Sequence, residues 1–205
     1  MGQVFRVSEQ YLDQLSFGEF VEIGTSRNGD DGSTKTLAEW ASRLGFTLTT
    51  VDMDPRNCDF VRELNIPNCT ILNEKGEDYL YHRIYSMRPI NYLYLDNFDW
   101  DWHPDRVVDF IRDQQERYTE LGIEMNNVNS QSAHLTQMIY ALPHMAERCL
   151  VVCDDTWYNK WWGHYSGKSG AVVPFLLANG FEILYTEEEP VYGTILGRDI
   201  TVRQN

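Results

Sequence analysis

Carboxylic acids stand at the ends of the apolar, β-branched segments of this chain. Glu22 lies in segment 20–23, Asp52 ends segment 46–52, Asp96 follows segment 92–95, and Asp154 and Asp155 follow segment 149–153. If these segments are parallel strands, their carboxyl ends meet at one edge of a sheet, where open α/β sheets bind ligands. Phosphate groups would be repelled by so many carboxylates. The pattern therefore favours a ligand that carries hydroxyl groups and a positive centre.

Three of these acids, Asp96, Asp154 and Asp155, are expected at adjacent strand ends. Three converging carboxylates repel one another strongly unless a hard cation lies between them, and Mg²⁺ prefers oxygen ligands. A metal ion there would bind a substrate hydroxylate and lower its pKa, so that catalysis would consist mainly of positioning and charge neutralisation. The alternative for Asp154 and Asp155 is a pair of helix or turn caps.

The segment between Phe20 and Trp40 changes from apolar to glycine-rich and then to helix-favouring residues. This order predicts a strand, a glycine turn and a helix, and with the next strand it forms a β-α-β unit of the nucleotide-binding kind. A dehydrogenase is the alternative, but its spaced Gly-x-Gly-x-x-Gly fingerprint is absent. A phosphate loop is disfavoured because Lys35 follows Ser33 and Thr34 instead of preceding them.

Helical and extended segments alternate along the rest of the chain. We expect helices over about 8–15, 33–44, 54–64, two turns before Pro89, 105–121, 132–145 and 170–178, and strands over 20–23, 46–52, 69–72, 92–95, 149–153, 181–185 and 192–196. A polar bridge (126–131) and an aromatic loop (156–165) connect them. The predicted fold is α/β: a doubly wound, mostly parallel seven-stranded sheet with an antiparallel closing hairpin and an inserted long helix after strand four.

Composition restricts the partners of this chain. Its 205 residues and 42% hydrophobic content suit one domain, 1–205. The formal charge of −14 argues against nucleic acid and against an anionic membrane, and it favours a small-molecule substrate; a homo-oligomer is left open. Without an export signal or an apolar span, we expect a cytoplasmic protein. The four cysteines lack C-x-x-C spacing and are expected to be buried thiols.

Taken together, segments 22–25 and 32–34, Asp52, Asp96 and the pair Asp154 and Asp155 resemble a class I S-adenosylmethionine-dependent methyltransferase. The resemblance is to the metal-dependent small-molecule O-methyltransferases related to catechol O-methyltransferase, and it covers nearly the whole chain. It implies a Rossmann-like methyltransferase fold, S-adenosylmethionine as cofactor, and Mg²⁺ or another divalent cation.

The resemblance also implies roles for individual residues. Cofactor contacts would be Glu22, Gly24, Thr25, Ser33, Asp52, Met53, Gly76, Glu77 and Asp96, with Asp52 on the ribose hydroxyls and Met53 against the adenine. Metal ligands would be Asp96, Asp154 and Asp155. The general base would lie three residues beyond Asp96, where relatives carry Lys or His and this chain carries Asp99. His103 and His134 are the alternative bases.

Two segments depart from the family pattern. The first-motif loop carries an insertion over 26–31, and the segment between Asp96 and Asp154 is long, so that the helix within it is expected to be a lid or an oligomer surface. Trp157, Trp161 and Trp162 could line a pocket, pack in the core or form a dimer contact. The function predicted is O-methylation of a natural product or sugar. The alternatives are another metal-dependent reaction, such as hydroxylation, and a non-catalytic cofactor-binding protein.

Overall fold

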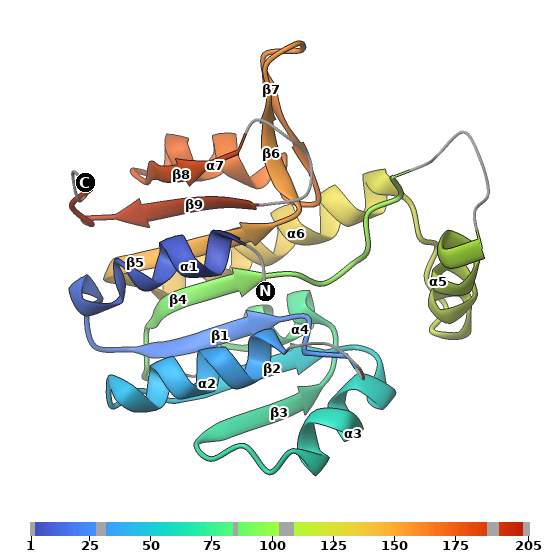
Figure 1. The fold of residues 1–205 in the computed structure, drawn as a ribbon, viewed down its shortest axis with the longest axis horizontal. Helices are drawn as coiled ribbons and strands as arrows, with labels where there is room; N and C mark the ends of the chain where they lie inside the picture. The colour runs from blue at the N-terminus through green and yellow to red at the C-terminus, as the bar shows by residue number, and fades with distance from the viewer. Residues whose placement is uncertain (1–2, 28–31, 84–85, 103–108, 188–192, 203–205) are drawn as a thin grey trace.

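Seven strands form one sheet in the order β3-β2-β1-β4-β5-β9-β8 (Figure 1). The computed structural model describes residues 3–27, 32–83, 86–102, 109–187 and 193–202. The strands are β1 (Glu19–Ile23), β2 (Leu48–Asp52), β3 (Cys69–Asn73), β4 (Ile90–Leu95), β5 (Met145–Asp154), β8 (Glu182–Thr186) and β9 (Gly193–Arg198). Strands β1 to β5 are parallel, and β9 runs antiparallel to both β5 and β8. The predicted fold class is confirmed.

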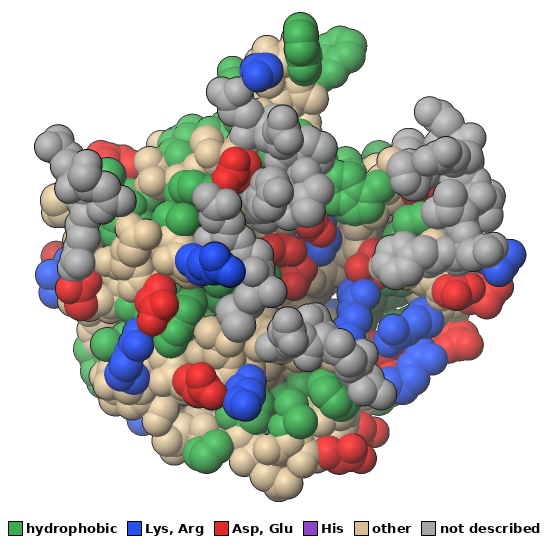
Figure 2. Space-filling view, in the orientation of Figure 1, with side chains coloured by type: hydrophobic (Ala, Val, Ile, Leu, Met, Phe, Trp, Pro, Cys, Tyr) green, Lys and Arg blue, Asp and Glu red, His purple; other side chains and the backbone are tan. Residues whose placement is uncertain are grey.

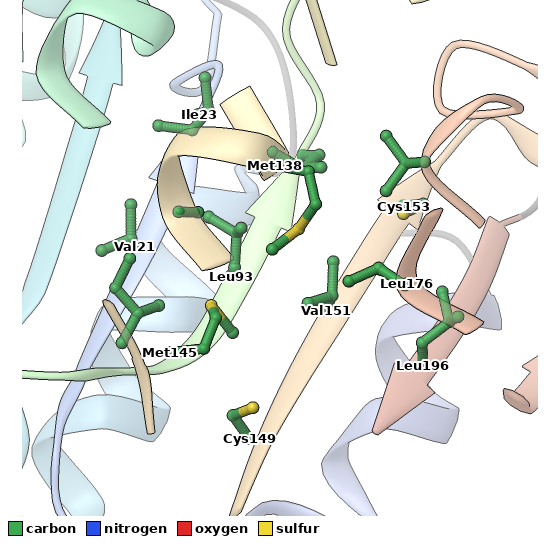
Figure 3. Packing of buried hydrophobic residues seen from close by; sticks show 14 of the residues in the cluster. Val21, Ile23, Leu93, Met138, Met145, Cys149, Val151, Cys153, Leu176 and Leu196 are labelled. Carbon is green, nitrogen blue, oxygen red and sulfur yellow. The ribbon is translucent and has the colours of Figure 1, made fainter. Parts of the chain in front are cut away.

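Helices cover both faces of this sheet (Figure 1). They are α1 (Gln3–Glu9), α2 (Ser33–Arg43), α3 (Pro55–Glu63), α4 (Gly76–His82), α5 (Asp109–Glu120), α6 (Asn127–Ala141) and α7 (Val172–Ala178). Alternate strand residues face opposite sides: Val21 and Leu93 pack with α4, α6 and α7 (Figure 3), whereas Phe20 and Tyr92 pack with α1 and α2. Two buried cores therefore hold the strand ends in fixed positions.

Helix boundaries follow the predicted local signals in α2 and α3. Gly45, with a φ of 74°, follows the end of α2, in a conformation that glycine adopts without strain. The Asp54 side chain accepts a hydrogen bond from the Arg56 backbone N–H at 2.9 Å, and Pro55 occupies the first helical position. These two predictions are confirmed.

Two predicted helix positions are wrong. The first helix occupies Gln3–Glu9 rather than 8–15, and Ser8 does not cap its start: the Ser8 hydroxyl donates to the Phe5 carbonyl at 2.9 Å. The polar segment 126–131 is mostly helical, because the Asn126 side chain accepts from the Asn129 N–H at 2.7 Å and so caps α6. Helix α6 ends at Ala141, so β5 begins four residues before the predicted strand.

The predicted aromatic loop is a β-hairpin formed by β6 (Thr156–Asn159) and β7 (His164–Gly167). It projects away from the main sheet (Figure 1). Trp157 is buried and its ring stacks on Trp102 with centroids 5.3 Å apart, whereas Trp161 and Trp162 are 86% and 76% exposed. The aromatic residues therefore divide between packing and solvent.

Helix α5 lies beyond the carboxyl ends of the strands (Figure 1). Its residues Ile111 and Tyr118 form a small buried cluster with Phe98 and Met125. The predicted start of this helix at 105, His103, and positions 28–31 of the loop insertion lie outside the described residues. Among the described helices, none is long and apolar enough to cross a membrane.

Candidate functional site

The site begins where β1 meets the end of β4. The Asp96 N–H donates to the Ile23 carbonyl at 2.9 Å, which brings the two strand ends together. Gly24 has a φ of 97°, and a Cβ there would lie 2.6 Å from the backbone of Asp96 and Asn97. Only glycine fits this close approach.

Glu22 joins β1 to the first turn of α2 and to β2 through hydrogen bonds. Its carboxylate is fully buried and accepts hydrogen bonds from the hydroxyls of Ser33 (2.5 Å), Thr50 (2.6 Å) and Thr34 (2.7 Å). Burial raises the pKa of Glu22 to about 7, against the lowering effect of these hydroxyls. Glu22 lines neither the cavity beyond β1, β2 and β4 nor the cavity that adjoins it, and its described contacts are to protein hydroxyls.

A first cavity of about 120 Å³ lies beyond β1, β2 and β4. Its lining includes four predicted cofactor contacts, Asp52, Met53, Gly76 and Glu77. The Asp52 carboxylate accepts from the backbone N–H groups of Asp54 (2.7 Å) and Thr25 (3.2 Å) and from the Asn57 amide (3.1 Å). Burial raises the pKa of Asp52. All three described donors are neutral groups, and the carboxylate faces a cavity.

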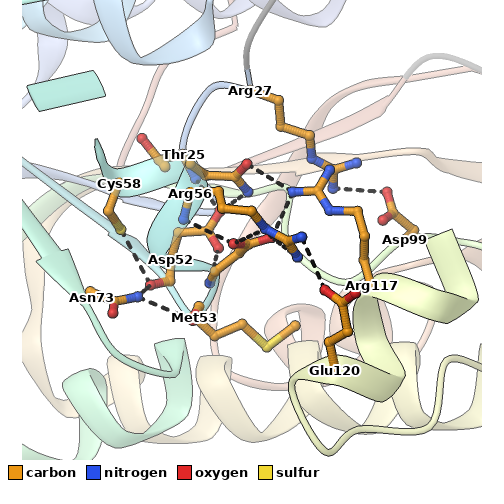
Figure 4. A network of polar contacts seen from close by, with 12 residues as sticks. Thr25, Arg27, Asp52, Met53, Arg56, Cys58, Asn73, Asp99, Arg117 and Glu120 are labelled. Carbon is orange, nitrogen blue, oxygen red and sulfur yellow. Dashed lines mark hydrogen bonds and ion pairs between the residues drawn. The ribbon is translucent and has the colours of Figure 1, made fainter. Parts of the chain in front are cut away.

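Helix α5 covers this cavity with Gln114, Arg117 and Tyr118. The Arg117 guanidinium donates to Asp54 at 2.6 Å and to the Asn57 side chain at 3.1 Å. Arg56 donates in turn to Glu120 of α5 at 3.0 Å (Figure 4). Desolvation acts to raise the pKa of Asp54, but hydrogen bonds from Arg56 and Arg117 lower it to about 2. Ion pairs thus attach α5 to α3 across the cavity.

A second cavity of about 200 Å³ adjoins the first, and both are lined by Arg27, Asp52 and Asp99. Its lining also contains the remaining predicted cofactor contacts other than Glu22, namely Gly24, Thr25, Ser33 and Asp96, together with Asp154 and Asp155. In the space-filling view, acidic and basic side chains meet in a hollow near the strand ends (Figure 2). The three predicted metal ligands therefore line one cavity.

The cation between these three carboxylates is a lysine. The Lys168 Nζ lies 2.8 Å from Asp96, 2.9 Å from Asp155 and 3.9 Å from Asp154, and the Lys168 side chain is only 5% exposed. Burial acts to lower the pKa of Lys168, but the aspartates outweigh burial and hold it well above its ordinary value. Burial and the charge of Asp96 raise the pKa of Asp154 well above its usual range.

The predicted metal site must be revised on this geometry. The ammonium group stands where a divalent ion would need to contact the same oxygens. Within the described parts of the chain, no group of three or more His, Cys, Asp or Glu side chains is arranged to hold a metal ion. The residues present therefore do not fit a divalent cation while Lys168 keeps this position.

The three predicted bases differ in their position relative to the two cavities. Asp99 lines both cavities, but its carboxylate pairs with the Arg27 guanidinium at 2.9 Å. His134 is fully buried in α6, where desolvation lowers its pKa to about 4, and it lines neither of these cavities. A role for His134 as the base is not supported, because its buried ring does not reach either cavity in which a substrate could bind. His103 lies outside the described residues.

Sequence reasoning missed the cations of the site, Arg27, Arg117 and Lys168. Lys168 had a signal, because it stands between Gly167 and Gly170 shortly after the acids of β5. Arg27 is part of the loop insertion, and Arg117 looks like an ordinary polar residue of an amphipathic helix. For these two, only the fold shows which carboxylate lies opposite.

The seven-stranded sheet with its antiparallel β9 places the chain among proteins that share a methyltransferase fold. No protein-family model and no curated protein matches the sequence. Similar solved structures include SMU.1697c of Streptococcus mutans, provisionally named a methyltransferase and solved with SAH (13% identity, 98% of this chain and 99% of that chain covered, TM-score 0.52). A provisionally named rRNA methylase of Clostridium thermocellum has 11% identity, the same coverage and a TM-score of 0.56.

A methyltransferase homologue from Pyrococcus horikoshii is a third similar structure. It has 13% identity to this chain and a TM-score of 0.52, and the match covers 93% of this chain and 65% of that one. At such low identities, these likenesses show the fold that the proteins share.

Proposed function

We propose that this protein is an S-adenosylmethionine-dependent methyltransferase that acts on a hydroxyl group of a small molecule. One observation carries the proposal: Asp52, Met53, Gly76 and Glu77 line one cavity at the carboxyl edge of the sheet. These are the residues that the family resemblance assigns to the ribose and the adenine. The similar structure of SMU.1697c was solved with SAH, which supports the same cofactor here.

The bound cofactor would extend across the two cavities, with its adenosine half in the first and its methionine half in the second. Asp52 borders both cavities, and its carboxylate can accept hydrogen bonds from both ribose hydroxyls. Gly24 and Thr25 line the second cavity, where the methionine half would lie. The carboxylates of that cavity favour a positive sulfonium centre.

A bound cofactor would supply an electrophilic methyl group to the acceptor oxygen and would leave as S-adenosylhomocysteine, with the acceptor's hydroxyl proton passing to water. The protein contributes by holding the acceptor oxygen in line with the carbon–sulfur bond of that methyl group. Lys168 lies between the three carboxylates that would hold a metal ion.

A small molecule is favoured over RNA as the acceptor. The similar protein of Clostridium thermocellum is named for rRNA methylation, but this chain has a formal charge of −14. The second cavity is lined by five aspartates and two cations, Arg27 and Lys168. A phosphate backbone would be repelled by both the net charge and this lining.

Calorimetry with S-adenosylhomocysteine tests the cofactor assignment. Asp52→Ala should weaken binding roughly 10-fold or more, because hydrogen bonds to a charged group contribute about 1.5–3 kcal/mol. Asp59→Ala in the next element, α3, is the matched control, since Asp59 is an exposed residue that lines neither cavity. Wild-type affinity in Asp52→Ala would refute the ribose contact, and no binding by wild type would refute the cofactor.

Turnover is tested separately, by following S-adenosylhomocysteine release against a library of small hydroxylated molecules. The expected product is the acceptor molecule with one hydroxyl converted to a methyl ether. Cofactor binding without transfer to any acceptor would favour a non-catalytic binding protein instead.

A further inference from the structure

Lys168 occupies the position that a divalent metal would take among Asp96, Asp154 and Asp155. We propose that its ammonium group is a built-in replacement for that metal, so that the site binds no divalent cation and the protein works without one. The proposal concerns this chain's own carboxylates and lysine. Only its consequence for the acceptor, given below, rests on the proposed function.

The turn that carries Lys168 is attached to the strand end that carries two of the acids. The Lys168 N–H donates to the Asp155 carbonyl at 3.1 Å, and the Ser169 N–H donates to the Thr156 hydroxyl at 3.0 Å. Gly167, with a φ of 90°, fits against Asp155 so closely that a Cβ would lie 1.8 Å from the same carbonyl. The lysine is therefore held to Asp155 by its backbone as well as by its ammonium group.

The turn is also fixed from the opposite side. The Gln131 side-chain amide of α6 donates to the Gly167 carbonyl at 3.1 Å, and a Cβ at Gly170 would lie 3.0 Å from that amide nitrogen. Asp155 itself has a φ of 44°, in the left-handed region that Asp tolerates better than most residues. These contacts define one position for the lysine, and the side chain is 5% exposed in it.

Charge explains why a second cation is excluded. The ammonium group contacts one oxygen of Asp96 at 2.8 Å and one oxygen of Asp155 at 2.9 Å. A divalent ion contacts carboxylate oxygens at roughly 2.0–2.6 Å, so an ion on these oxygens would lie within a few ångströms of Nζ. The repulsion between the two cations, added to the loss of the buried ion pairs, opposes entry of the metal.

Within the proposed function, Lys168 also has a donor for the acceptor. An ammonium group has three N–H donors, and Asp96 and Asp155 take two of them. The third can donate to the acceptor oxygen, which lies in the cavity that Lys168 lines. A fixed positive charge would then stabilise the oxygen as its proton leaves, which is the part that the metal was predicted to play.

The test is a titration with Mn²⁺, followed by electron paramagnetic resonance, on the full-length protein. The wild type should show no saturable site up to about 1 mM Mn²⁺, since structured metal sites of oxygen ligands usually bind more tightly than this. Lys168→Ala removes the ammonium and leaves the three carboxylates, so it should gain one site that binds at least 10-fold more tightly than any wild-type binding. Adding Asp154→Ala to that variant should weaken the new site.

Arg27→Ala is the matched control, because it removes the other cation of the same cavity while the three carboxylates keep Lys168. It should gain no Mn²⁺ site. Saturable stoichiometric binding by wild type would overturn the proposal, and so would a Lys168→Ala variant that binds no better than wild type.

Two features keep the outcome clear if Lys168→Ala folds poorly. The wild-type titration needs no variant, and Mg²⁺ should raise the thermal midpoint of Lys168→Ala but not that of wild type, because a ligand stabilises the state that binds it. Both readouts are independent of methyl transfer. A failure of S-adenosylhomocysteine binding would therefore refute the proposed function and leave the metal result intact.

Discussion

Substituting Glu22 by Gln should change how the stability of this protein depends on pH. Glu22 is fully buried between α2 and β2, whose hydroxyls it binds, and burial raises its pKa from 4.5 to about 7. At about 1.36 kcal/mol per unit, this shift corresponds to about 3 kcal/mol. Because the folded-state pKa is the higher one, the folded protein binds the proton more tightly than the unfolded chain. Glu22 therefore contributes stability that is fully present below pH 4.5 and is lost as the pH rises through about 7.

Glu22→Gln is neutral at every pH and removes this dependence. The free energy of unfolding of wild type, minus that of Glu22→Gln, should fall by about 2–3 kcal/mol between pH 5 and pH 8. Urea unfolding of both proteins at several pH values measures this difference, and titration of the other groups cancels in it. Glu63→Gln, at an exposed glutamate of α3, should retain the wild-type pH dependence. A wild-type minus Glu22→Gln difference that stays constant within about 0.5 kcal/mol would refute the account of Glu22.

Two further substitutions test the frame of the site. Gly24→Ala should lower the free energy of unfolding by about 2 kcal/mol or more, because its Cβ would lie 2.6 Å from the backbone of Asp96 and Asn97, just after β4. Gly45→Ala, also at positive φ but in open space, should cost about 1 kcal/mol. Equal losses in denaturant titrations would contradict the close approach at Gly24. Arg117→Ala should weaken S-adenosylhomocysteine binding roughly 3- to 10-fold in calorimetry, because it removes the ion pair that joins α5 to Asp54. Arg112→Ala on the same helix should bind as wild type does. Equal affinities for wild type and Arg117→Ala would show that α5 does not cover the bound cofactor.

The cations of the site explain how so many acids coexist at one sheet edge. Lys168 forms ion pairs with Asp96 and Asp155, Arg27 with Asp99, and Arg117 with Asp54. Asp52 differs from these acids, because its described hydrogen bonds come from neutral donors. That difference supports its assignment as the carboxylate that receives a ligand hydroxyl.

The order of strands and helices was accessible from the sequence because its signals are local. Asp54 and Pro55 start α3, Gly45 follows the end of α2, and the apolar runs give the strands. The exceptions have local reasons too. Asn126 caps α6 earlier than the apolar pattern indicates, and β6 and β7 mix aromatic with polar residues in a stretch whose sequence is typical of a loop.

The sequence by itself determined that the acids at the carboxyl ends of β2, β4 and β5 lie at one edge, because parallel strands joined by helices place all their carboxyl ends there. Only the tertiary structure decided what balances those acids. Lys168 reaches Asp96 across 72 positions of sequence, and Glu22 faces the hydroxyls of Ser33 and Thr34 in α2 and lines neither cavity. Such pairings depend on side-chain direction and on long-range approach, which neither composition nor spacing encodes.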